Sequence, residues 1–272
     1  MANFSRLGFW LSGAIVALVI VLGCVAPFIP YQPEDAVSYD RVLSAPSMAY
    51  LFGTDEQGRD IGMRLVKGTE AFFLPGLMSA AIALVFGSLA GALTGYASGS
   101  VRTVVLGGLQ LLDTLPRLVF IILVCTIRDP SVMLIAFVAG VLFIPTIATV
   151  IRRKVEALAS EDYILAHIAH GFSPVRVLLY HILWLQCWPI LVRQAAYVFG
   201  YVLFVETGLS YLGDYGVQEP DPSWGNMVAQ VRSLPSDAAW PWLIPAAAIV
   251  VTISGFLAFG NLAARQGEES TR

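Results

Sequence analysis

Six long stretches almost without charged residues divide this sequence, and they limit what the chain can fold into. A helix needs about 20 apolar residues to cross a hydrocarbon layer about 30 Å thick, because each residue rises about 1.5 Å. With 57% hydrophobic and 13% charged residues, the chain is far more apolar than a soluble domain. The sequence therefore predicts an all-α membrane protein of six transmembrane helices, since a membrane barrel would require short alternating strands. We expect these helices at 7–28, 72–97, 103–127, 131–151, 189–212 and 240–264.

A cluster of basic residues after the fourth stretch indicates the orientation. Arg152, Arg153 and Lys154 are adjacent, and bacterial membrane proteins retain such clusters in the cytoplasm. Six crossings then return both termini to the cytoplasm, with most acidic residues on the outer side. The chain divides into an N-terminal anchor helix with an outer segment (1–70), a core transmembrane domain (71–264) and a short cytoplasmic tail (265–272).

The three cysteines do not indicate a disulfide or metal-binding pattern. Cys24, Cys125 and Cys187 have no spacing typical of disulfides or metal sites, so we expect them to be packing residues. Cys24 ends an apolar run that approaches a lipoprotein cleavage site, but the run is too long for a signal peptide. The first helix is therefore expected to remain in the mature protein.

Two features inside the stretches leave alternatives open. Gly87, Gly91 and Gly95 share one helix face, which favours close packing either within the chain or against a sister subunit. Asp113 and Arg117 are four residues apart and can pair, and Pro116 between them predicts a kink. The pair belongs either to a pore-lining helix or, as we favour, to a neutralised site buried in the bundle.

Two further charges lie in the fifth stretch. Arg193 and Glu206 are separated by about 20 Å along a helix, so they cannot pair with each other. We expect each of them near an interface.

Catalytic motifs are missing from the sequence. Neither lysine, Lys67 or Lys154, stands in a phosphate-binding loop, so ATP hydrolysis must come from another chain. The sequence also contains no zinc-protease helix motif and no serine nucleophile turn. We therefore expect no catalytic residue, no metal site and no cofactor in this chain.

A polar, helix-prone segment from 152 to 184 separates the fourth and fifth stretches. Ser160 is suited to cap a short helix, and Glu161 and Asp162 in its first turn favour the helix dipole. Gly171 can end this helix, and Pro174 prevents its simple continuation. The segment predicts a short surface helix, a tight turn and a return, which together would fit a groove on a partner. His167 and His170 lack further metal ligands, so we interpret them as exposed helix residues.

The segment resembles the cytoplasmic EAA loop of ABC-importer permeases. The matching positions are Leu165-Ala166-His167, then Gly171 and His181-Ile182-Leu183-Trp184, preceded by Glu161-Asp162-Tyr163. Leu165, His167 and Trp184 depart from the motif. In this family the loop docks onto an ATPase subunit.

Two outer motifs resemble one branch of that family. The segment GTDEQGRD at 53–60, with Arg64 and Gly68, is similar to a signature of dipeptide, oligopeptide and nickel permeases. We expect this turn-rich segment and the short amphipathic stretch after it to lie on the outer membrane surface. The sequences LSYLG at 209–213 and PSWGNM at 222–227 are similar to a second outer segment of the same branch. The resemblance covers nearly the whole chain and is to the C-type subunit.

This resemblance implies a type I importer fold with alternating access, driven by separate ATPases that bind ATP and Mg²⁺. The implied partners are a homologous B-type permease, two ATP-binding subunits, an extracytoplasmic binding protein and membrane lipid, with no nucleic acid. The residues assigned to ATPase coupling are Glu161, Asp162, Tyr163, Ala166, His167, His170, Gly171 and Pro174. Those assigned to the translocation path or outer loop are Asp113, Arg117, Glu206, Pro222, Ser223 and Trp224.

The substrate is the least determined property. A peptide is our first expectation, with nickel or an opine-type metallophore complex as the alternative because the outer loop at 214–237 is acidic. A stand-alone channel or secondary transporter is the rival class, and inverted repeats would support it.

Overall fold

The computed structural model describes residues 2–32, 37–128, 131–159, 161, 170–173, 176–213, 215–233 and 238–270. These described residues are almost entirely helical, and an isolated bridge between Thr54 and Asp60 is their only β pairing. The long helices are α1 (Ala2–Val25), α3 (Phe73–Tyr96), α4 (Gly99–Asp113), α5 (Arg117–Ile127), α6 (Val132–Ala159), α9 (Trp188–Leu212) and α11 (Trp240–Ser270). The shorter elements are η1 (Ala26–Phe28), η2 (Tyr39–Arg41), α2 (Ile61–Gly68), η3 (Thr69–Ala71), the π-helix η4 (Val177–Trp184), α10 (Trp224–Ala229) and η5 (Gln230–Arg232).

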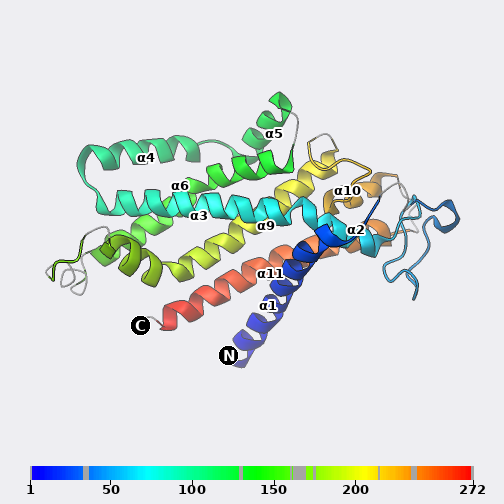
Figure 1. Ribbon diagram of the computed structural model, residues 1–272, viewed down its shortest axis with the longest axis horizontal. Coiled ribbons are helices and arrows are strands. Elements are labelled where there is room, and N and C mark those ends of the chain that lie inside the picture. The colour runs from blue at the N-terminus through cyan, green and yellow to red at the C-terminus, as the bar shows by residue number, and fades with distance from the viewer. Residues whose placement is uncertain are drawn as a thin grey trace.

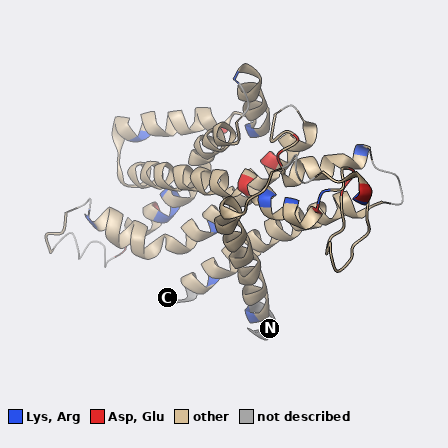
Figure 2. Ribbon diagram, turned by 45° about the vertical axis from the view of Figure 1, so that its right-hand side comes forward, with Lys and Arg blue, Asp and Glu red and all other residues tan. Residues whose placement is uncertain are grey.

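Five helical segments of the described chain are long and apolar enough to cross a membrane. They are Arg6–Phe28, Ile61–Tyr96, Val132–Ala159, Trp188–Leu212 and Trp240–Gly267. A sixth crossing results if α4 and α5 form one span. The ribbon of the long helices carries few charged residues (Figure 2). The predicted all-helical membrane fold is therefore confirmed.

The third predicted helix is broken rather than kinked. α4 and α5 meet at an angle of 78°, and Pro116 between them has an extended conformation, with φ −66° and ψ 106°. Proline lacks the amide hydrogen of a helical residue and disfavours helical geometry in the residue before it. The position of the break was predicted correctly, but a single helix over 103–127 was wrong.

The helices run back and forth between two ends of the molecule. α3 lies beside α6, and α11 packs against both α9 and α1 (Figure 1). The two chain termini lie near each other, and α1 and α11 run from them toward α2 and α10 (Figure 1). This arrangement agrees with an even number of crossings.

The glycine stripe of α3 packs within the chain. A Cβ atom at Gly91 would lie 2.6 Å from the carbonyl oxygen of Ala148 in α6. Added Cβ atoms at Gly87 and Gly95 would lie 2.7 and 2.8 Å from the Cβ atoms of Ile147 and Val155. The missing side chains thus let α3 and α6 approach closely, and this decides between the two alternatives that the sequence left open.

The cysteines follow the expectation in part. Cys125 and Cys187 are buried as packing residues, whereas Cys24 is exposed on α1, and all three are free thiols.

Candidate functional site

The outer end of the molecule is built on a turn that requires glycine. Gly53 and Gly58 have φ values of +74° and +72°, a region that residues with a side chain rarely adopt. A Cβ at Gly53 would lie 2.6 Å from the carbonyl oxygen of Ser44. The turn then enters α2, where the Asp60 carboxylate accepts a hydrogen bond from the amide of Gly62 at 2.8 Å and so caps the helix. The motif at 53–60 therefore has a structural role, since its glycines form the turn and its Asp60 caps α2.

Four charged residues meet beside this turn, and we call them the charge cluster: Asp55, Arg59, Arg64 and Glu219. Arg59 donates from Nε to Asp55 at 2.8 Å and from Nη1 to Glu219 at 2.7 Å. Arg64 donates from Nη1 to Asp55 and from Nη2 to Glu219, both at 2.6 Å. Each arginine therefore bridges the same two carboxylates, and the four formal charges cancel.

The cluster is buried on one side and open on the other. The side chains of Arg59, Arg64 and Asp55 are at most 2% exposed, whereas that of Glu219 is 40% exposed. Burial by itself lowers the pKa of Arg59, but the carboxylates of Asp55 and Glu219 outweigh it and raise that pKa above its usual value. The guanidinium is therefore charged at every physiological pH.

Sequence reasoning singled out three members of the cluster only as parts of a motif, and it missed Glu219. The alternation of acids and bases between 55 and 64 was the available signal. Nothing in the sequence pairs this segment with Glu219, which follows Arg59 by 160 residues.

The second outer motif holds the first one in place. The Ser223 hydroxyl and the Asn226 side chain form a reciprocal cap at the start of α10, with hydrogen bonds of 3.1 and 3.0 Å. Asn226 also accepts a hydrogen bond from Arg64 at 3.4 Å. Trp224 donates from Nε1 to the carbonyl oxygen of Leu65 at 2.8 Å. We call residues 53–68 and 219–227 together the outer clamp.

The clamp changes the interpretation of three predicted path residues. Ser223 and Trp224 are 0% and 3% exposed, so they hold the outer segments together, and Pro222 lies beside them. The amphipathic stretch is helix α2, but its Ile61 and Arg64 are fully buried against protein. That these residues also border a substrate path stays a prediction.

Glu206 is enclosed by protein rather than placed near an interface as predicted. Its side chain is 0% exposed and accepts a hydrogen bond from Ser210 one turn later in α9, at 2.7 Å. Ser210 in turn accepts from the amide of Val217 at 2.9 Å, which ties the end of α9 to the segment before α10. Glu206 therefore helps to hold the end of α9 against the segment that leads into the outer clamp.

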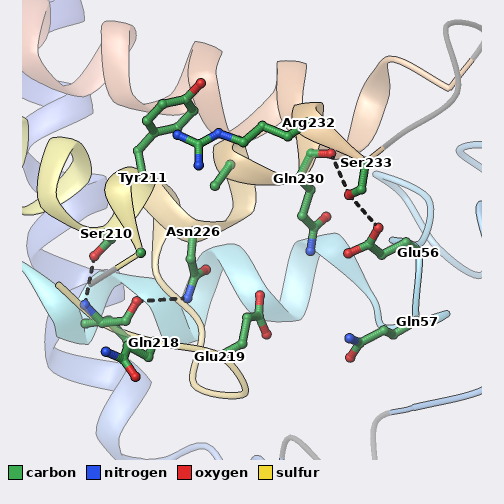
Figure 3. Close-up of a pocket in the computed structure, with 13 residues that line it drawn as sticks. Glu56, Gln57, Ser210, Tyr211, Gln218, Glu219, Asn226, Gln230, Arg232 and Ser233 are labelled. Carbon is green, nitrogen blue, oxygen red and sulfur yellow. Dashed lines mark hydrogen bonds between the residues drawn. The ribbon is translucent and has the colours of Figure 1, made fainter. Parts of the chain in front are cut away.

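A polar pocket of about 450 Å³ opens next to the clamp (Figure 3). Glu219 and Asn226 of the clamp line it, together with Gln218 and Gln230. The guanidinium of Arg232 lies 4.3 Å from the ring centre of Tyr211. Ser233 donates to Glu56 at 2.8 Å across the pocket rim. Such a mixture of donors and acceptors suits a polar ligand or a polar protein surface.

The Asp113–Arg117 pair forms across the helix break but is not buried. The two groups are 3.5 Å apart, and the side chain of Asp113 is 59% exposed, so the favoured interpretation of a buried neutral pair was wrong. Arg117 also donates to Thr146 at 2.6 Å and lies 4.4 Å from the ring centre of Phe143. The pair therefore anchors the break to α6.

Much of the predicted coupling loop lies outside the described residues. This applies to Asp162, Tyr163, Ala166, His167 and Pro174, and to the Ser160 cap. The described positions Glu161, His170 and Gly171 are exposed, beyond the end of α6.

Gly171 has φ +85°, the left-handed conformation that the sequence predicted for it. The return segment is the π-helix η4, in which the His181 ring lies 5.8 Å from that of Phe172. Among the described residues, no three His, Cys, Asp or Glu side chains gather as metal ligands.

Comparison with known proteins gives a consistent result. Residues 83–266 match the family described as binding-protein-dependent transport system inner membrane component. The probable D,D-dipeptide transport system permease protein DdpC of Escherichia coli (strain K12) is 30% identical over 92% of this chain and 83% of its own length. The dipeptide transport system permease protein DppC of Alkalihalophilus pseudofirmus is 29% identical over 91% of this chain and 83% of its own length. The oligopeptide transport system permease protein OppC of Haemophilus influenzae is 30% identical over 91% of this chain and 79% of its own length.

Proposed function

This chain belongs to the family of inner-membrane components of binding-protein-dependent transport systems, and from that premise we propose that it is the C-type permease subunit of an ATP-driven importer of di- and oligopeptides. The observation that carries the peptide assignment is the identity of about 30% to permeases named for peptide transport, over about nine-tenths of the chain. The chain catalyses no reaction itself. Partner ATPases bind ATP and Mg²⁺ and hydrolyse the nucleotide.

The proposed orientation places both termini and the coupling loop in the cytoplasm. The cluster Arg152, Arg153 and Lys154 supports it, since it lies in the last turns of α6, just before that loop. The outer clamp and its polar pocket then face the binding protein, because they lie toward the opposite end of the helices (Figure 1). A B-type permease and two ATP-binding subunits complete the transporter.

The architecture suggests how ATPase closure reaches the membrane. The loop around Gly171 joins α6 to η4 and α9, so a force on the loop moves the inner ends of these helices. The close contact of Gly91 with Ala148 couples α3 to α6. The outer clamp stays rigid because its charges are paired and its helix caps are satisfied. Alternating access then results from movement of the inner helix ends relative to a fixed outer end.

Reconstitution of the whole transporter in liposomes tests this proposal. We expect uptake of a radiolabelled dipeptide that requires both ATP and the loaded binding protein, and excess unlabelled dipeptide should compete. Uptake of nickel or a metallophore complex that is indifferent to excess dipeptide would reject the peptide assignment. Uptake driven by an ion gradient in vesicles containing this chain alone would reject the importer assignment.

A further inference from the structure

Arg193 is a cation within a membrane-spanning helix. It lies in α9, and it forms no ion pair with any residue in the described part of the chain. Arg117, by comparison, has Asp113 at 3.5 Å. A charge within a membrane-spanning segment is costly unless it meets a partner or a hydrated cavity, so an arginine without an ion pair in such a segment indicates a binding function.

Arg193 borders a cavity of about 310 Å³ between α6, α9 and α11. Five of the six lining side chains are polar, and Leu257 is the exception: Thr146, Arg193, Gln194, Tyr197 and Asn261. Pockets of this size accept small organic ligands. The amides of Gln194 and Asn261 can both donate and accept hydrogen bonds, as the peptide group does. We call this space the α6–α9–α11 cavity.

In the proposed orientation the cavity lies toward the cytoplasmic end of the helices, and positive charges surround it. Thr146 precedes Arg152 of the basic cluster by six residues, or about 9 Å along α6. Behind Thr146, Arg117 donates to its hydroxyl at 2.6 Å. Among the described residues Arg117 pairs with Asp113 and Arg152 pairs with Glu156, whereas Arg193 has no acidic partner, so one positive charge is uncompensated. The site therefore favours an anion.

We propose that the α6–α9–α11 cavity binds the peptide in transit, with Arg193 holding its C-terminal carboxylate and with Gln194 and Asn261 bonding its amide groups. This inference rests on the proposed peptide import. A guanidinium matches a carboxylate with two parallel hydrogen bonds, and the low dielectric of the membrane strengthens them. A lipid phosphate would require donors only, whereas this cavity offers donors and acceptors together.

The test compares trialanine with trialanine amide, which lacks the carboxylate, in the complete transporter reconstituted in liposomes. In R193Q we expect trialanine uptake per ATP hydrolysed to fall about tenfold, the scale of a lost charge-assisted hydrogen bond. Uptake of the amide should change less than twofold, as should ATP hydrolysis stimulated by the loaded binding protein. R193K should be intermediate, because lysine keeps the charge without the fork. R6Q is the matched control, because it removes an exposed arginine at the start of α1 and should behave as wild type.

Three results would overturn the inference while leaving peptide import intact. Equal changes for both substrates would show that the carboxylate is not recognised. Loss of the sister permease from purified R193Q would show that Arg193 pairs with that subunit. A wild-type requirement for anionic lipid that R193Q lacks would identify a headgroup phosphate as the ligand. A wild-type transporter that imports no peptide would reject the proposed function and this inference with it.

Discussion

Arg64 of α2 donates a 2.6 Å hydrogen bond to Glu219, which lies 155 residues later in the chain. This contact joins the segment before the second crossing to the segment between the last two crossings. It closes the outer end of the bundle around a neutral set of four charges. The outer clamp is therefore held by paired charges, of which Asp55, Arg59 and Arg64 are buried and Glu219 is partly exposed.

Loss of Arg64 should destabilise the protein strongly. In R64M the carboxylate of Asp55 stays buried and keeps Arg59 as its only charged partner among the described residues, and breaking a buried ion pair costs about 3–5 kcal/mol. The midpoint of thermal unfolding in detergent, followed by intrinsic fluorescence, measures the loss. The control R128M removes an exposed arginine at the end of α5 and should change stability by less than about 0.5 kcal/mol. Equal midpoints for R64M and R128M would contradict a structural role for the charge cluster.

Trp224 should contribute through both its ring and its hydrogen bond. W224F keeps the packing against Phe72, 4.8 Å away between ring centres, but loses the bond to the carbonyl oxygen of Leu65. We expect a loss of about 0.5–1.5 kcal/mol for W224F and about 3–5 kcal/mol for W224A in the same unfolding assay. W10F, at a position 73% exposed on α1, is the control and should be nearly neutral. A W224A protein as stable as W224F would show that the ring does not support the clamp.

The glycine stripe permits a matched pair of substitutions. G91A places a methyl group 2.6 Å from the carbonyl oxygen of Ala148, and such overpacking costs about 1–3 kcal/mol. G107A in α4 meets no atom within 4 Å and should be neutral or stabilising by up to about 1 kcal/mol. Thermal unfolding of the two variants gives the comparison. If G91A left the unfolding midpoint unchanged but dissociated a sister subunit, packing between subunits would be the correct explanation.

Gly171 should be needed for coupling rather than for stability. Its φ of +85° strains a β-branched residue, although a Cβ there would meet no atom within 4 Å. Strain of this kind costs about 1–2 kcal/mol, and asparagine tolerates the conformation better. In the reconstituted transporter, G171V should lower peptide uptake per ATP hydrolysed, whereas G171N should retain most of it. Normal uptake and normal ATPase binding in G171V would remove the loop from the coupling pathway.

Several features could be predicted because they depend on neighbouring residues. Helix length and apolarity are local properties, so the membrane-spanning helices were correct apart from the one broken at Pro116. The left-handed conformation of Gly171 was also predictable, since a helix end followed by proline favours it. The break at Pro116 was correct in position, but its 78° angle and the hydrogen bond from Arg117 to Thr146 of α6 were not predicted.

The remaining features were decided by contacts between distant segments. Glycines spaced four residues apart predict that another helix packs closely against α3, but only the fold shows that this helix is α6. The sequence does not show whether a charged side chain will form an ion pair or how far it will be buried. Asp113 was expected to be buried and is exposed, whereas Glu206 was expected near an interface and is enclosed.

The sequence by itself determined a multi-pass helical membrane protein, the place of its breaks and turns, and a family resemblance that its motifs carry. The tertiary structure decided that Arg59 and Arg64 bridge Asp55 and Glu219, and that Arg193 borders a polar cavity between α6, α9 and α11. The physical reason is that helix formation in a bilayer satisfies the backbone of each segment locally. The pairing of side chains, in contrast, depends on which helices become neighbours, and that is settled only when the whole chain packs.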